Sequence, residues 1–268
     1  MGKNETVALS NGVTMPAIGF GTYLLDNAQA SQCVLDSLQD GYRLIDGAAF
    51  YHNETGVREG LKQAFSQIPG LTRQDVFVTS KVWKDSMGYE MTMASFENSL
   101  HQLGLETLDL YLIHWPSGDH ELDRSSWQAL IDLYKAGRVR AIGVSNFMPE
   151  DLMPLFDMEI VPMVNQIMVH PGWKQEMVTD FCRKHGIRIM AWSPLGRGRV
   201  LNNHLLRQIA LAHGKSTAQI CLRWEIQKGF VPIPKSVNPV RIRDNLDVFD
   251  FELSPEEMQA IDSLPVME

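Results

Sequence analysis

The chain has 268 residues, of which 44% are hydrophobic and 21% are charged, with ordinary numbers of glycine and proline. This composition is typical of a globular protein and excludes a collagen-like or disordered chain. The formal net charge of −8 argues against broad binding to nucleic acid or acidic membranes. A local cluster such as Lys235, Arg241 and Arg243 could still hold a small phosphorylated ligand.

Cysteine usage and hydropathy indicate a compartment. The three cysteines, Cys33, Cys182 and Cys221, are widely spaced and contain no CxxC, so we expect neither a disulfide framework nor a zinc site. The first residues, MGKNETVALSNG, lack the apolar core of a secretory signal. No later stretch approaches the ~18 apolar residues of a membrane span. We therefore expect a cytoplasmic protein with no membrane partner.

The first predicted element is a β-hairpin over residues 6–15, because Asn11-Gly12 separates two short apolar runs. After it, eight short β-rich runs alternate with longer segments that have room for a crossover helix. These predicted strands are Ala17–Phe20, Arg43–Ile45, Val76–Ser80, Leu108–Ile113, Val139–Val144, Met163–Gln166, Ile187–Trp192 and Val231–Pro234.

Several of the intervening segments carry apolar residues at helical spacing. They are Met93, Phe96, Leu100 and Leu103; Trp127, Leu130, Ile131 and Tyr134; and Val178, Phe181, Cys182 and His185. No composition shift divides the chain, and no glycine-rich fingerprint follows the first strand, as a doubly wound sheet would usually show. Eight β-α repeats in this length predict an α/β fold, a (β/α)8 TIM barrel with an N-terminal β-hairpin, as one domain over residues 1–268.

In such a barrel the carboxyl ends of the strands face the active site. Polar or aromatic residues lie at seven of these ends: Asp46, Lys81, His114, Ser145 and Asn146, Gln166, Trp192 and Lys235. The other histidines of the chain form no HExxH motif and show no paired spacing typical of metal ligands, so we expect no metal.

Three of these residues and a nearby tyrosine form a set of acid-base groups. Asp46, Lys81 and His114 should converge, and Tyr51 lies just beyond Asp46 in the loop IDGAAFYHNE. A nearby ammonium should lower the tyrosine pKa from about 10 toward neutrality, so that Tyr51 could donate a proton. Asp46 would orient Lys81, and His114 could hydrogen-bond a substrate carbonyl. Such a set suits hydride addition to a carbonyl.

Seven ordered motifs, IDGAAFYHNE, TSKVW, LIHWP, GVSNF, VNQ, AWSPLG and IPKSVNPVRIRDN, carry a resemblance. Together they resemble the aldo-keto reductase superfamily, most closely its small bacterial members. The resemblance implies an NADPH-dependent reductase of aldehydes or ketones, with Tyr51 as the general acid. It implies that Lys81 lowers the tyrosine pKa, that Asp46 pairs with Lys81 and that His114 orients the carbonyl.

The same resemblance implies a nicotinamide that stacks on Trp192 while Ser145, Asn146 and Gln166 hold its carboxamide. The full set of implied NADPH/NADP+ contacts is Gly21, Thr22, Tyr23, Asp46, Ser145, Asn146, Gln166, Trp192, Ser193, Pro194, Leu195, Gly196, Lys235, Ser236, Val237, Asn238, Arg241, Asp244 and Asn245. Lys235, Ser236 and Arg241 offer the cationic and hydrogen-bonding groups that a 2′-phosphate needs, which favours NADPH over NADH.

The residues expected to line the substrate pocket are Tyr23, Phe50, Trp83, His114 and Trp115. Small dicarbonyls, keto-sugar acids and aromatic aldehydes are the expected substrates, and a monomer is the simplest assembly. Two positions depart from the common family pattern: Trp192 replaces the usual Tyr, and Gly47 replaces the usual Thr.

Two other functions are compatible with the same scaffold. A non-catalytic, nucleotide-sensing subunit would keep the cofactor segment without turnover. A barrel hydrolase or aldolase would use Lys81 as a Schiff base. Neither explains both the acid-base set and the cofactor segment.

Overall fold

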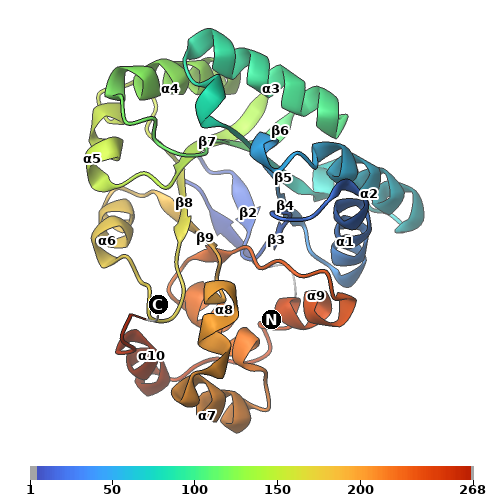
Figure 1. Ribbon diagram of the computed structural model, residues 1–268, viewed down its shortest axis with the longest axis vertical. Coiled ribbons are helices and arrows are strands. Elements are labelled where there is room, and N and C mark those ends of the chain that lie inside the picture. The colour runs from blue at the N-terminus through green and yellow to red at the C-terminus, as the bar shows by residue number, and fades with distance from the viewer. Residues whose placement is uncertain (1–4, 267–268) are drawn as a thin grey trace.

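The computed structural model describes residues 5–266, so the first four residues of the segment expected to lack a signal sequence lie outside the described residues. The predicted hairpin is confirmed as strands β1 (Thr6–Ala8) and β2 (Thr14–Pro16), which pair antiparallel with Val7 opposite Met15. It lies across one end of the barrel, in the middle of the ring of strands in Figure 1, and Met15 is fully buried there.

Eight parallel strands follow in sequence order around the ring, as predicted. They are β3 (Phe20–Gly21), β4 (Leu44–Asp46), β5 (Phe77–Val82), β6 (Leu108–Ile113), β7 (Val139–Ser145), β8 (Val164–Met168), β9 (Arg188–Trp192) and β10 (Val231–Pro232). The amides of Gly19 and Gly21 donate to the carbonyls of Pro232 and Pro234, at 2.9 and 3.0 Å, so the first and last strands also meet. The fold is the predicted (β/α)8 barrel.

Strand β10 is shorter than the predicted segment Val231–Pro234. Pro232 and Pro234 have no N–H, so the regular ladder cannot continue through both of them. Ile233 still donates to the carbonyl of Ala191 at 3.1 Å, which keeps the segment against β9.

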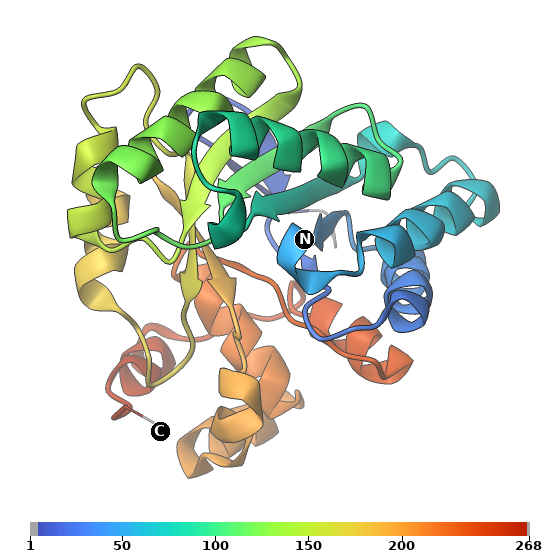
Figure 2. The same cartoon turned by 45° about the horizontal axis from the view of Figure 1, so that its top comes forward.

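Helices surround the strands in Figures 1 and 2. The α-helices are α1 (Asn27–Asp40), α2 (Glu54–Gln67), α3 (Tyr89–Leu103), α4 (His120–Lys135), α5 (Pro149–Leu152), α6 (Glu176–Lys184), α7 (His204–His213), α8 (Thr217–Gln227), α9 (Pro239–Leu246) and α10 (Pro255–Asp262). Short 3-10 helices lie between them: η1 (Ala49–Tyr51), η2 (Arg73–Asp75), η3 (Lys84–Ser86), η4 (Met153–Leu155) and η5 (Gly196–Asn202).

The predicted apolar stripes pack against the core. Phe96 of α3 and Trp127 of α4 are fully buried, whereas the stripe residues Met93, Tyr134 and Phe181 are only partly buried. On α6, Cys182 is buried, but His185 is the exposed residue that ends the helix. The periodicity therefore placed the stripe correctly and extended it one residue too far.

Two glycines let α1 and α2 approach closely, which fixes the start of α2 near the carboxyl end of β4. A Cβ atom on Gly56 would lie 2.3 Å from the carbonyl oxygen of Asn27. One on Gly60 would lie 2.6 Å from the carbonyl oxygen of Ser31. Only glycine permits this spacing.

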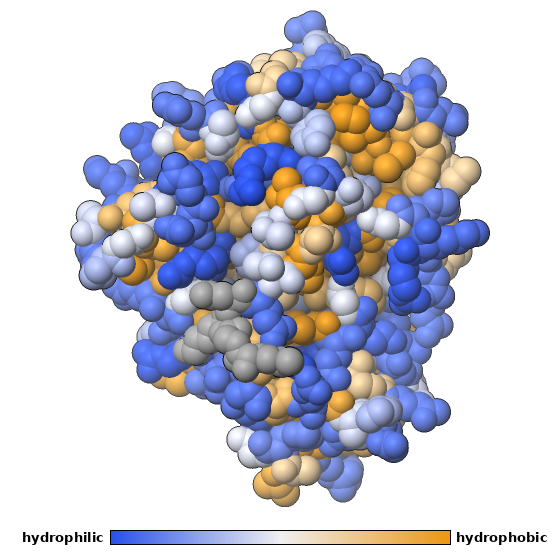
Figure 3. All heavy atoms as spheres, turned by 180° about the vertical axis from the view of Figure 1, so that it is seen from behind, coloured by the Kyte–Doolittle hydropathy of each residue, from blue (hydrophilic) through white to orange (hydrophobic). Residues whose placement is uncertain are grey.

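The three cysteines are free and buried, as expected. Within residues 5–266, no helix combines the length and apolar character that crossing a membrane requires. Figure 3 shows the side opposite to Figure 1 as mostly hydrophilic, with small separate apolar areas.

Candidate active site

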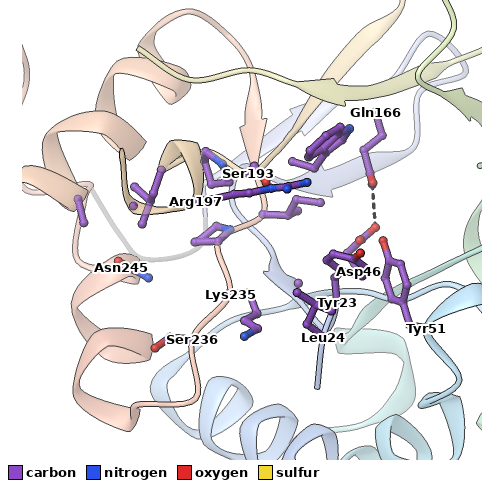
Figure 4. Close-up of a pocket in the computed structure, with 18 of the residues that line it drawn as sticks. Tyr23, Leu24, Asp46, Tyr51, Gln166, Ser193, Arg197, Lys235, Ser236 and Asn245 are labelled. Atoms are coloured by element: carbon purple, nitrogen blue, oxygen red, sulfur yellow. Dashed lines mark hydrogen bonds between the residues drawn. The ribbon is translucent and has the colours of Figure 1, made fainter. Parts of the chain in front are cut away.

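The carboxyl ends of the strands open into a cavity of about 840 Å³. Figure 4 shows its two ends: Asp46, Tyr51 and Gln166 lie at one, and Lys235, Ser236 and Asn245 lie at the other. Because the strands are parallel, side chains that are far apart in the sequence meet at this rim. We call the first end the tyrosine end and the second the cationic end.

Lys81 and Asp46 form a buried ion pair beneath the tyrosine end. Lys81 Nζ lies 3.0 and 2.8 Å from the two carboxylate oxygens of Asp46 and donates at 2.8 Å to the carbonyl of Gly47. Gln166 Nε2 donates to Asp46 Oδ1 at 2.8 Å, the dashed line in Figure 4. Burial lowers the pKa of Lys81, while the charge and hydrogen bonds of Asp46 act to raise that pKa. The sequence predicted that Lys81 follows its strand. In the structure Lys81 lies within that strand, β5.

Tyr51, on η1, lies over this pair. Its Oη is 3.4 Å from Lys81 Nζ. The pKa of Tyr51 is raised well above its usual value, by burial first and then by the charge of Asp46. This direction is opposite to the expected lowering. The reason is that Asp46 offsets the charge of Lys81, so burial outweighs the ammonium. A neutral phenol therefore holds its proton at neutral pH.

His114 follows β6 and is 7% exposed. Its ring centroid is 5.5 Å from that of Tyr51, and its Nδ1 has no protein partner within the described chain. Burial, followed by the charge of Lys81, lowers the pKa of His114 to about 2. The ring is therefore neutral near pH 7, with one nitrogen able to donate a hydrogen bond.

Trp192 ends β9 and makes a contact that the sequence did not predict. Its Nε1 donates to Asn146 Oδ1 at 2.9 Å. Asn146 has a left-handed backbone (φ 62°), and its Nδ2 donates at 3.0 Å to the carbonyl of His114. A tyrosine has no ring N–H, so this chain of contacts depends on the tryptophan.

Aromatic rings form the outer wall of the tyrosine end. Phe50 and Trp83 are stacked, with centroids 3.8 Å apart and planes 16° from parallel. Tyr23 packs against Tyr51 at 5.0 Å. Trp115 also lines the cavity, so all four aromatic residues proposed for the substrate pocket lie there.

Three cations line the cavity, Arg197, Lys235 and Arg241, and Figure 4 shows Lys235 at the cationic end. Within the described residues none of the three forms a salt bridge, so their charges are available to an anion. Thr217 and Ala218, at the N-terminus of α8, also line the cavity. Backbone N–H groups at a helix N-terminus favour phosphate. These donors fit the phosphates of a dinucleotide.

Four of the predicted cofactor residues do not line the cavity: Thr22, Gly196, Val237 and Asn238. Thr22 is fully buried and donates to the carbonyl of Asp46 at 2.9 Å. Asn238 caps α9 by accepting hydrogen bonds from the amides of Val240 and Arg241. Thr22 and Asn238 therefore stabilise the backbone around the cavity and do not line it. Lys81 also lies beneath the cavity floor.

Sequence reasoning missed several lining residues. Arg197 lies between Gly196 and Gly198 in the sequence and lines the cavity. Ser216 caps α8 with Gln219 in a capping box, and that spacing was readable in the sequence. The remaining missed residues are Leu24, Gly198, Leu201, Thr217, Ala218, Ile233 and Pro234.

Comparison with known proteins agrees with this geometry. A family model described as the Aldo/keto reductase family matches residues 17–265. The chain is 50% identical over 262 residues to a glyoxal reductase of Bacillus subtilis, covering 97% of this chain and 92% of the relative. It is 48% identical over 263 residues to a 9,11-endoperoxide prostaglandin H2 reductase of Trypanosoma cruzi, covering 96% and 90% of the two chains.

Solved structures give the same result. An aldo/keto reductase from Brucella melitensis has a TM-score of 0.92 and 42% identity, covering 97% of this chain and 98% of that chain. A Bombyx mori aldo-keto reductase in complex with NADP has a TM-score of 0.91 and 35% identity, covering 98% and 93%.

The chain belongs to the aldo/keto reductase family. As a member of that family it is an NADPH-dependent oxidoreductase, which confirms the predicted enzyme class and cofactor.

Proposed function

We propose that the protein reduces the carbonyl of small aldehydes and ketones to an alcohol, with Tyr51 as the proton donor. One observation carries this proposal. The neutral Tyr51 phenol lies 3.4 Å from Lys81 Nζ and beside the neutral ring of His114, in the floor of a cavity that continues to three cations.

Bound NADPH would supply a hydride to the carbonyl carbon. The cationic end would hold its phosphates. Lys235 and Arg241 would bind the 2′-phosphate, because both carry a positive charge and can donate hydrogen bonds to it. Ser145, Asn146 and Gln166 would hold the nicotinamide carboxamide, and Trp192 would provide the stacking surface. All six line the one cavity.

Tyr51 and His114 would act on the carbonyl oxygen. The ring N–H of His114 would donate a hydrogen bond to that oxygen and fix its position. Tyr51 Oη would give its proton to the oxygen as negative charge develops there. Lys81, held by Asp46, would stabilise the phenolate that remains. Oxidation of the alcohol would use the same groups in reverse.

The pocket supports small, flat substrates. Tyr23, Phe50, Trp83 and Trp115 present ring faces and edges, which favour aromatic aldehydes, and the open rim also admits dicarbonyls and keto-sugar acids. We further propose that the protein is a cytoplasmic monomer whose partner is this small-molecule carbonyl. Its formal charge of −8 supports the absence of a nucleic-acid or membrane partner.

The test is a panel of methylglyoxal, a keto-sugar acid and benzaldehyde, with NADPH oxidation followed by absorbance. We expect turnover with at least one of them and the lowest KM for the aromatic aldehyde. Binding of NADPH with no turnover on the whole panel would favour the nucleotide-sensing function instead. Trapping of substrate on Lys81 by borohydride would favour a Schiff base. The contact of Lys81 with both carboxylate oxygens of Asp46 argues against that chemistry, because it holds the amine beneath the cavity floor and away from a substrate carbonyl.

A further inference from the structure

A second carboxylate lies behind the strand that carries Lys81 and has no place in the chemistry above. Glu54 is the first residue of α2 and is only 4% exposed. Its Oε1 accepts a hydrogen bond of 2.6 Å from Ser80 Oγ, and Ser80 is fully buried on β5. A buried carboxylate is costly unless other groups hold it. The contact with Ser80 is therefore a defined part of the fold.

This contact joins the two segments that bring Tyr51 and Lys81 together. Glu54 follows Tyr51 by three residues, and Ser80 immediately precedes Lys81. Successive side chains on a strand point to opposite faces, so Lys81 points into the barrel while Ser80 points toward the helices. Glu54 thus holds β5 from outside, at the level where Tyr51 meets Lys81 on the inside.

The Glu54 contact is the shorter of the two side-chain links to β5. Among the described residues, the side-chain hydrogen bonds between residues 49–54 and β5 are Ser80 to Glu54 at 2.6 Å and Lys81 to Tyr51 at 3.4 Å. Asn53 donates to the carbonyls of Thr22 and Leu25, which anchors the turn to a different part of the rim. The start of the turn is held to β5 by Gly47, whose amide donates to the carbonyl of Thr79 at 3.1 Å and whose carbonyl accepts from Lys81 at 2.8 Å. The far end of the turn, beyond Tyr51, is held to β5 by Glu54.

The charges of Glu54 and Lys81 support each other across the strand. Burial raises the pKa of Glu54, whereas hydrogen bonds from Ser80 and Ser99 and the charge of Lys81 lower it. The charge of Glu54 in turn raises the pKa of Lys81 against the effect of burial. Removing the carboxylate would therefore affect Lys81 as well as the turn.

We propose that Glu54 is a positioning residue: its hydrogen bond with Ser80 fixes the Tyr51 turn against β5 and so sets the Tyr51–Lys81 separation needed for proton transfer. This inference rests on the proposed role of Tyr51 as proton donor. Glu54 itself touches neither substrate nor cofactor.

Three variants separate the contact from the charge. Ser80→Ala removes the donor and keeps the carboxylate. Glu54→Ala removes the acceptor and its negative charge together. Glu54→Gln removes the charge but keeps an oxygen that can accept from Ser80. We expect kcat to fall about tenfold or more in Ser80→Ala and Glu54→Ala, and less in Glu54→Gln, because small misplacements of reacting groups are costly. The KM and the NADPH dissociation constant should stay within about twofold, and the solvent isotope effect on kcat should rise, because proton transfer becomes slower.

The control is Glu225→Gln. Glu225 is also a fully buried carboxylate on a barrel helix, and it does not line the cavity. Its replacement is expected to change the unfolding temperature and to leave kcat unchanged. If Glu54→Ala does not fold, Ser80→Ala tests the contact from the other side.

Folded Ser80→Ala and Glu54→Ala proteins with wild-type kcat would overturn the proposal. The proposal would also be overturned if kcat fell while KM and the NADPH dissociation constant rose by similar factors, because a general structural role predicts that pattern. Crystal structures of the variants give a test that needs no activity. We expect Tyr51 Oη to lie farther than 3.4 Å from Lys81 Nζ, and an unchanged separation would refute the positioning role even if the wild-type protein proved to reduce no carbonyl.

Discussion

The indole of Trp192 donates a hydrogen bond of 2.9 Å to the side-chain oxygen of Asn146. The same asparagine donates to the carbonyl of His114. The residue proposed to stack on the nicotinamide is thereby connected to the residue proposed to orient the substrate.

Trp192→Phe is expected to weaken NADPH binding. Phenylalanine keeps an aromatic surface but cannot donate to Asn146, and one such hydrogen bond contributes about 1 kcal/mol. The NADPH dissociation constant should therefore rise about fivefold, as measured by titration calorimetry. An unchanged dissociation constant would show that the contact with Asn146 has no role in ordering the cofactor site.

Tyr51→Phe is expected to abolish carbonyl reduction while the protein still binds NADPH. The substitution removes the proton donor and little of the ring packing, and a positioned acid typically contributes about 10² to 10⁴ in rate. Single-turnover NADPH oxidation measures the chemical step, and calorimetry measures binding. Wild-type turnover in this variant would remove Tyr51 from its proposed role.

The pH profile should reflect the directions of two pKa shifts. The raised pKa of Tyr51 keeps the phenol protonated to higher pH, so reduction should not decline until well into the alkaline range. Alcohol oxidation needs the phenolate and should rise over the same range. The His114 pKa of about 2 keeps its ring neutral, so no acid limb from this histidine is expected between about pH 5 and 8. A histidine-like limb near pH 6.5 that disappears in His114→Gln would contradict this assignment.

The double variant Lys235→Ala, Arg241→Ala is expected to weaken NADPH binding at least about a hundredfold and NADH binding far less. Each charged hydrogen bond to phosphate contributes about 1.5 to 3 kcal/mol, and NADH has no 2′-phosphate. The matched control is Arg243→Ala on the same helix, because Arg243 contacts Asp40 at 3.1 Å and does not line the cavity. Equal losses for the two cofactors would refute the phosphate assignment.

Gly56→Ala is expected to lower the free energy of unfolding by about 1 to 3 kcal/mol. The added Cβ would lie 2.3 Å from the carbonyl oxygen of Asn27, so α1 and α2 would have to separate. Gly70→Ala provides the comparison, since its Cβ would meet no atom within 4 Å and only its positive φ opposes the change. Denaturant unfolding of both proteins gives the two values. An unchanged free energy of unfolding in Gly56→Ala would mean that the spacing of α1 and α2 does not depend on this glycine.

The barrel and the residues at its rim could be predicted from the amino-acid sequence. The eight β-rich runs appear as strands in the predicted order, and the rim residues Asp46, Tyr51, Lys81 and His114 converge as expected. This was possible because strand periodicity is local, and because parallel strands bring their carboxyl ends to one side whatever the intervening helices contain.

The electrostatics of the site and the contacts between distant segments could not be predicted in this way, because they depend on how the chain folds. The pKa of Tyr51 could not be predicted from its nearness to Lys81, because burial and the charge of Asp46 reverse the expected direction. The Trp192–Asn146 and Ser80–Glu54 contacts likewise join residues 46 and 26 positions apart. Desolvation and such contacts depend on the three-dimensional surroundings of a side chain, and neither residue type nor spacing records those surroundings.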